Sequence, residues 1–105
     1  MDYEVINNEE EQQFEILSMG EKATLSYRMY KGDIAFMHTL VPKDLEGKGL
    51  ASALAKGAFA YAEKHNLPVM VYCPFVSVFV QRHPEYKKFI DPKYVGPAAP
   101  RPSDT

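Results

Sequence analysis

The chain has no tryptophan, only one cysteine and no large excess of charge of either sign. The single cysteine, Cys73, excludes an internal disulfide and an all-cysteine metal site, and it leaves either a buried apolar residue or a functional thiol. The net charge of −2, from 12 Lys and Arg against 14 Asp and Glu, provides no basic surface for a nucleic acid. We therefore expect neither a metal site nor a nucleic-acid partner.

Long hydrophobic runs are also missing. No apolar segment approaches the roughly 20 residues that span a bilayer, and the acidic segment 1–11 lacks the basic-then-apolar order of a secretory signal. The sequence thus predicts a cytoplasmic protein with no membrane partner. Its 105 residues are enough for one hydrophobic core. We expect a monomer with one domain over residues 1–94 and a flexible, proline-rich tail over residues 95–105.

The N-terminal part alternates apolar and polar residues, as half-buried strands do. This pattern covers residues 3–6, 14–16 and 23–29, and turn signals separate the segments at 7–13, 19–22 and 31–33. Residues 34–41 are almost continuously apolar and end at Pro42, which is typical of a strand buried on both faces. The order predicts an antiparallel meander that ends in a central strand.

After Pro42 the apolar period becomes helical. Apolar residues at 50, 54, 58, 61 and 62 predict a helix that ends within residues 63–66. A valine-rich strand is expected at 67–72, and a right-handed crossover would make it parallel to the strand at 34–41. Pro74 then opens a second helix over residues 75–83, and Phe89 with Ile90 predicts one more strand.

The junction between the central strand and the first helix holds two glycines, Gly47 and Gly49. A glycine inside a helix costs about 1 kcal/mol relative to alanine, so another use for these two residues is expected. The first turn of a helix offers unpaired N–H groups and a partial positive charge, and a loop without side chains lets a phosphate reach them. The alternative is that both glycines only form a tight turn.

Three motifs around this junction resemble one family. The stretch 46–51, Glu-Gly-Lys-Gly-Leu-Ala, resembles the coenzyme A pyrophosphate loop of the GNAT acetyltransferase superfamily, whose pattern is Gln/Arg-x-x-Gly-x-Gly/Ala. Gly49 and Ala51 match that pattern, whereas Glu46 replaces Gln or Arg. The segments His-Thr-Leu-Val-Pro at 38–42, Cys-Pro-Phe-Val at 73–76 and Arg-His-Pro-Glu-Tyr at 82–86 are similar to the small YjdJ-like branch of this superfamily.

The resemblance implies an α/β protein with a mixed sheet, the minimal GNAT fold. This fold is an antiparallel meander followed by β-α-β-α, with a splay for coenzyme A between the two central parallel strands. The resemblance also implies transfer of an acetyl group from acetyl-CoA to an amine of unknown identity, on a side that small members leave open. Two alternatives remain, a coenzyme A binding protein with little or no transferase activity and a structural module without a ligand.

Two residues are candidates for the chemistry. His38 in the central strand is expected to act as the base, and Cys73 is expected to relay a proton or accept the acetyl group; either residue can instead be structural. Larger relatives generally carry a tyrosine on the second helix that acts as the general acid. This chain has Phe79 at the comparable position, so Tyr72 and Tyr86 are the candidates to replace that tyrosine. The residues expected to contact acetyl-CoA are Leu40, Val41, Glu46, Gly47, Lys48, Gly49, Leu50, Ala51 and Pro74.

Overall fold

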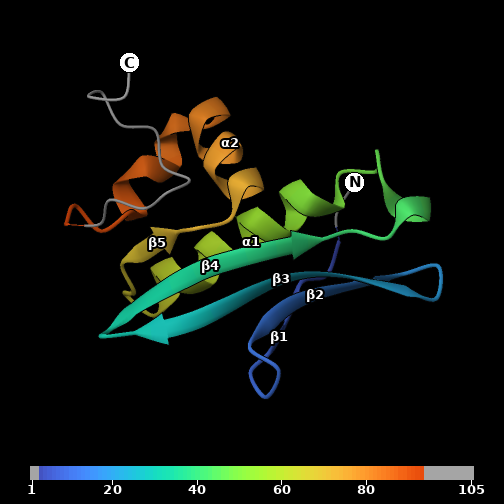
Figure 1. Cartoon of the computed structure of the whole chain (residues 1–105), viewed down its shortest axis with the longest axis horizontal. Coiled ribbons are helices and arrows are strands. Elements are labelled where there is room, and N and C mark those ends of the chain that lie inside the picture. Colours follow the sequence, from blue (N-terminus) through green and yellow to red (C-terminus); the bar gives the residue numbers. More distant parts are fainter. Residues whose placement is uncertain (1–2, 94–105) are drawn as a thin grey trace.

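A five-stranded sheet forms the base of the protein in the computed structural model, which describes residues 3–93. The strand order follows the sequence, and Figure 1 shows the strands side by side. The first four strands are antiparallel, and the fifth pairs parallel to the fourth. The strands are β1 (Ile6–Asn8), β2 (Gln13–Ser18), β3 (Glu21–Tyr30), β4 (Asp33–Leu40) and β5 (Val69–Val71). The predicted mixed α/β fold is confirmed.

Two α-helices cover one face of this sheet, and together they enclose a single hydrophobic core (Figure 1). They are α1 (Leu50–Lys64) and α2 (Pro74–Arg82), and short 3-10 helices precede α1 and follow α2, namely η1 (Lys43–Leu45) and η2 (Pro84–Phe89). No helix of residues 3–93 covers the opposite face, which we call the open face. Within that part of the chain no helix has the length and apolarity needed to cross a membrane.

Tight turns fix the register of the two long hairpins. Met19 and Gly20 between β2 and β3 have φ angles of 53° and 75°, and Lys31 and Gly32 between β3 and β4 have φ angles of 50° and 90°. Two consecutive residues with positive φ are the signature of the two-residue turn that matches the twist of paired strands. The turn predictions at 19–22 and 31–33 are therefore confirmed.

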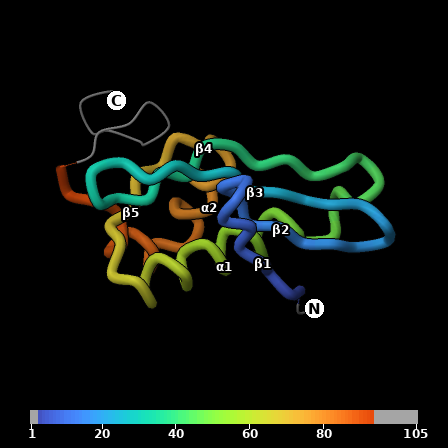
Figure 2. The backbone as a smooth tube through the Cα atoms, turned by 90° about the horizontal axis from the view of Figure 1, so that it is seen from below, coloured from blue at the N-terminus to red at the C-terminus, as the bar shows by residue number. Residues whose placement is uncertain are grey.

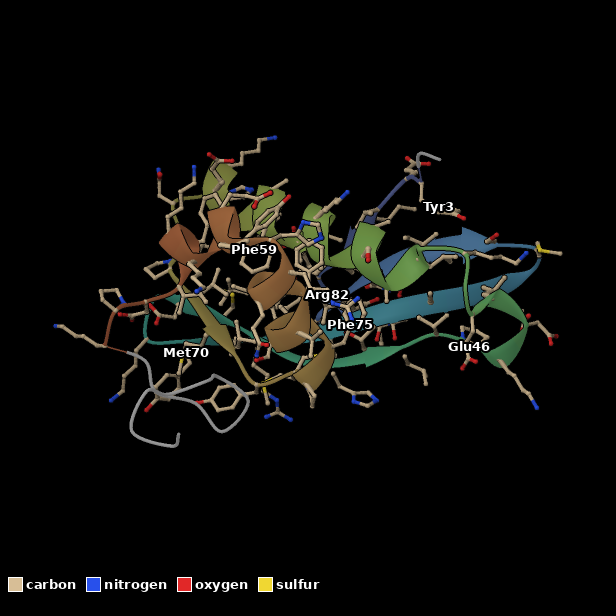
Figure 3. The ribbon with its side chains drawn as sticks, turned by 90° about the horizontal axis from the view of Figure 1, so that it is seen from above. Tyr3, Glu46, Phe59, Met70, Phe75 and Arg82 are labelled. Atoms are coloured by element: carbon tan, nitrogen blue, oxygen red, sulfur yellow. The ribbon has the colours of Figure 1, made fainter. Side chains whose placement is uncertain are left out.

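Phe59 lies at the centre of the aromatic core. Its ring centroid is 5.3 Å from that of Phe36 on β4, 6.4 Å from that of Phe79 on α2, and 5.0 and 5.9 Å from those of Tyr86 and Phe89 on η2 (Figure 3). The side chain is 1% exposed. One residue of α1 thereby joins the sheet to both C-terminal helical segments.

Three predictions about strands are wrong in part. The first strand begins only at Ile6, because residues 3–5 leave the sheet and pack beside α1. The strand at 34–41 is fully buried only over residues 34–36, because only these residues lie between β3 and β5, and β5 ends before the second half of the strand. Phe89 ends a 3-10 helix, and Ile90 makes a single bridge to Val69 instead of a strand. The predicted tail, residues 95–105, lies outside the described residues.

A pair of carboxyl groups occupies the end of β4 farthest from the glycine loop. Asp33 and Asp91 share a hydrogen bond, and desolvation together with this partner raises the pKa of Asp33 to about 6. Between about pH 4 and this value, the folded state therefore holds a proton on Asp33 that the unfolded state has lost. This proton stabilises the folded state; the contribution is complete below the ordinary aspartate pKa and is lost as the pH rises through about 6. The same hydrogen bond lowers the pKa of Asp91, which offsets part of the effect.

Asp33→Asn is expected to raise the midpoint of thermal unfolding at pH 7, because the amide keeps a hydrogen bond to Asp91 without the like charge. The gain should shrink at pH 4.5, where the wild-type pair already holds its proton. Circular dichroism melts at both pH values measure this difference, and Asp44→Asn at an exposed position of η1 is the control. A gain of equal size at both pH values would contradict the assignment.

Candidate active site

Strands β4 and β5 separate at the centre of the candidate site. Their parallel pairing covers only Phe36 and the two residues before it. The Phe36 carbonyl accepts hydrogen bonds from the backbone N–H groups of Tyr72 and Cys73, at 2.9 and 3.0 Å, and the chain then enters α2 at Pro74. Residues 37–40 of β4 continue without a described strand on that side. The predicted splay is thus present, although β5 is the edge strand of the sheet and not a central one.

A bulge in β4 determines which side chains beside the splay lie on the helix face of the sheet and which lie on the open face. Phe36 and His38 pair with consecutive residues of β3, so Met37 is an extra residue. Past this bulge, Thr39 pairs with the buried Leu25 and therefore faces the helices. His38 alternates with Thr39 and faces the open side.

The two predicted catalytic residues consequently lie on opposite faces of the sheet. His38 is exposed on the open face, where its backbone carbonyl accepts a hydrogen bond of 3.3 Å from the Ser26 hydroxyl. Cys73 is 1% exposed on the helix side, and its Sγ atom lies 3.1 Å from Oγ1 of Thr39. The fold does not bring His38 and Cys73 together. It pairs Cys73 with Thr39 instead.

The glycine loop ends in a helix start without a side-chain cap. Gly47 and Gly49 have φ angles of 79° and 80°, a region that glycine adopts without strain, and Gly49 is the N-cap of α1. The Glu46 N–H is already bonded to the Lys43 carbonyl, so this residue offers no free amide. The first-turn amides of α1, residues 50–52, have no partner within the helix by helical geometry. These amides, with those of the loop, form the group that can receive an anion.

The N-terminal residues 3–5 pack beside α1 and contact the glycine loop. The Tyr3 hydroxyl donates a hydrogen bond of 2.8 Å to the Lys48 carbonyl. Val5 fills the notch at Gly57, where an added Cβ would lie 2.8 Å from the Val5 side chain. Figure 2 shows this segment beside the first half of α1, and Figure 3 shows Tyr3 and Glu46 at the same end of the molecule. A cavity of about 640 Å³ lies between the segment, the loop and α1.

The other residues predicted to contact acetyl-CoA surround the splay and the loop. Leu40 is 57% exposed, Val41 is partly buried against the core, and Pro74 is exposed at the start of α2. Leu50 is 1% exposed, so only its backbone faces the loop. Phe79 is 3% exposed and belongs to the core. The remaining predicted positions, Glu46, Gly47, Lys48, Gly49 and Ala51, are exposed or half-buried within the loop and the first turn of α1.

Sequence reasoning missed two contacts of this site. The polar pair formed by Thr39 and Cys73 joins residues 34 positions apart, and its only signal was a threonine within an apolar strand. The bond from Tyr3 to Lys48 spans 45 positions, and no local pattern marks it. Both contacts depend on tertiary packing that short-range periodicity does not encode.

Comparisons with known proteins identify the family. The family model described as GCN5-related N-acetyl-transferase matches residues 13–89. Protein NATD1 of Danio rerio is 31% identical over 87 residues, which cover 78% of this chain and 79% of that relative. The solution NMR structure of a GCN5-like protein from Staphylococcus aureus has a TM-score of 0.66 and covers 90% of both chains, and at 24% identity it supports the fold alone.

The predicted family is confirmed by these matches, while the YjdJ-like branch stays a prediction. The match at 13–89 includes all of β2 to α2, and therefore both the splay and the glycine loop. The chain belongs to the GCN5-related N-acetyltransferase family and is an acyltransferase.

Proposed function

We propose that this acetyltransferase binds acetyl-CoA at the glycine loop and in the splay, and that it acetylates an amine arriving from the open face. The observation that carries the proposal is the junction itself. Among residues 3–93, no strand pairs with one edge of residues 37–40, and the chain then leads through η1, Gly47 and Gly49 into a helix N-terminus without a side-chain cap.

The glycine loop supports the phosphate half of this proposal. Up to four unpaired N–H groups and about half a positive charge at the start of α1 attract an anion. Lys48 adds an exposed cationic side chain, whereas Glu46 adds an exposed carboxylate that opposes binding. The backbone donors are independent of both side chains.

The edge of residues 37–40, which no described strand covers, supports the pantetheine half of the proposal. Residues 37–40 offer about 13 Å of strand edge at roughly 3.3 Å per residue. An extended pantetheine arm can hydrogen-bond to such an edge as an added strand does. The bulge at Met37 and the departure of β5 leave this edge accessible between the two faces.

The proposed chemistry is direct attack by the amine. His38 accepts a proton from the amine nitrogen as that nitrogen bonds to the acetyl carbon and the carbon–sulfur bond breaks. Cys73, next to Thr39, donates a proton to the departing sulfur, and solvent returns the proton from His38 to Cys73. The alternative mechanism is that Cys73 itself accepts the acetyl group before the amine does. Mass spectrometry of a quenched reaction distinguishes the two mechanisms, because only the alternative leaves one acetyl group bound to the protein.

Gly49→Ala should weaken acetyl-CoA binding by about tenfold, because a side chain at positive φ costs on the order of 1–2 kcal/mol and turns the loop amides away. Gly20→Ala is the matched control, since Gly20 has a φ of 75° and no heavy atom within 4 Å of an added Cβ, as at Gly49. Both variants should lose similar stability, and only Gly49→Ala should lose affinity in isothermal titration. Equal affinities would remove the loop from the site.

The proposal is tested by measuring coenzyme A release from acetyl-CoA with and without a mixed panel of amines. We expect release that depends on both the protein and the amine. Acetyl-CoA at a hundred times its dissociation constant should also stabilise the fold by about 2.7 kcal/mol. Stabilisation without amine-dependent release would favour a protein that only binds coenzyme A. Glu46 and the absence of a hydroxyl at Phe79 favour this second candidate.

A further inference from the structure

A row of polar side chains crosses the open face and ends at the splay. Asn8, Gln13, Ser26 and His38 are register partners on β1, β2, β3 and β4. Directly paired residues of a sheet share a face, so these four side chains form one line across the strands. The line ends at the proposed base, His38.

Arg28 lies in the neighbouring row. It is two residues from Ser26 on β3 and pairs with Ala35 on β4, which places it diagonally from His38. Diagonal neighbours in antiparallel strands are about 7–8 Å apart, within reach of a long side chain.

The carboxylates of the open face are already engaged. Glu15 is 6% exposed, and its Oε2 lies 3.4 Å from Nζ of Lys22, 2.6 Å from the Gln13 amide nitrogen and 3.0 Å from that of Asn8. The Gln13 hydrogen bond is the largest factor that lowers the pKa of Glu15.

Asp33, at the far end of β4, is bonded to Asp91. Arg28 is exposed, and no carboxylate of residues 3–93 lies within ion-pair distance of it. The Arg28 guanidinium is therefore available to an anionic group of a ligand that lies beside His38.

We propose that the acceptor is a small amine that also carries a carboxylate, and that Arg28 binds this carboxylate while the amine lies at His38. This inference rests on the proposed function. The guanidinium group matches a carboxylate with two parallel hydrogen bonds, which fixes the orientation of the acceptor as well as its position. The amine nitrogen then bonds to the acetyl carbon, His38 takes its proton, and coenzyme A leaves with the sulfur.

The test compares matched acceptors, each amino acid beside the amine that lacks its carboxylate. Lysine is paired with 1,5-diaminopentane, and β-alanine with ethylamine. We expect the carboxylate-bearing member to have a kcat/KM on the order of tenfold higher, which is typical of a charge-assisted hydrogen bond. Arg28→Gln should abolish this preference and leave acetyl-CoA affinity unchanged. Arg82→Gln, on the helix side in Figure 3, is the control that should keep it.

Preference for the diamine or for a basic peptide, or an unchanged preference in Arg28→Gln, would overturn the inference while leaving the transferase intact. If no amine promotes release, the transferase proposal fails instead. The carboxylate site is then judged by an NMR titration with N-acetyl-β-alanine. Amide shifts at residues 26–28 and 35–38 that disappear in Arg28→Gln would support the site, and no shifts there would overturn it.

Discussion

His38→Gln is expected to lower kcat for amine acetylation by about a hundredfold at pH 7, because a positioned general base contributes at least about this factor. Acetyl-CoA affinity should change less than about twofold, since His38 faces the open side and the proposed cofactor contacts of β4 are on its backbone edge. Steady-state rates at pH 7, with acetyl-CoA affinities from isothermal titration, measure both effects.

His65→Gln is the matched control for His38. His65 is an exposed histidine at the end of α1, so the same substitution there should leave kcat unchanged. A wild-type rate in His38→Gln would contradict the role of base, and a loss of acetyl-CoA affinity equal to the loss of rate would assign His38 to binding instead.

Phe59→Ala is expected to lower the free energy of unfolding by about 3–5 kcal/mol, the usual cost of removing a fully buried phenylalanine. The ring contacts Phe36, Phe79, Tyr86 and Phe89, so its loss opens a cavity between the sheet, α2 and η2. Chemical denaturation monitored by circular dichroism measures the change.

Phe75→Ala is the control for this core substitution. Phe75 is 36% exposed at the start of α2, so its removal should cost about 1 kcal/mol or less. Because the total stability of a small domain is about 5–15 kcal/mol, Phe59→Leu provides a milder variant with an expected cost of about 1–2 kcal/mol if Phe59→Ala does not fold. Equal costs for Phe59→Ala and Phe75→Ala would show that Phe59 is not the centre of the core.

The bulge at Met37 has the greatest influence on the chemistry. Without it, strict alternation would place residues 36, 38 and 40 on one face. With it, Phe36 and Thr39 both face the helices, and His38 faces the open side. The proposed base, His38, then lies on the proposed acceptor side and the buried thiol of Cys73 on the helix side of the same splay, an arrangement that suits two proton transfers at two different atoms.

Local patterns were sufficient to predict much of this fold. The helical spacing of Leu50, Leu54 and Ala58 predicted α1, because the buried face of a helix repeats at this period. The Met-Gly and Lys-Gly turns predicted the two hairpins, because their positive φ angles need these residue types. The fate of residues 84–90 was not predictable in this way, since their aromatic side chains pack against Phe59 in a 3-10 helix.

In the candidate site, too, local patterns predicted some features, whereas features that depend on tertiary structure were not predictable. Gly47 and Gly49 were identifiable because a helix start with two glycines is rare without a reason, and both have positive φ. The separation of His38 from Cys73 could not be predicted, because one inserted residue in β4 changes the face of every side chain after it. Gly57 gave no signal either, since its role depends on Val5, which lies 52 positions away in the sequence and against it in the fold.

The central claim is that acetyl-CoA occupies the glycine loop and the splay, and NMR amide shifts during a titration with acetyl-CoA test it most directly. The account predicts that the largest shifts fall at residues 37–41, 47–52 and 72–74, with Gly20 and the turn around it unchanged. The absence of shifts at millimolar acetyl-CoA, or shifts centred on the cavity around Leu67 and Ile90, would contradict it.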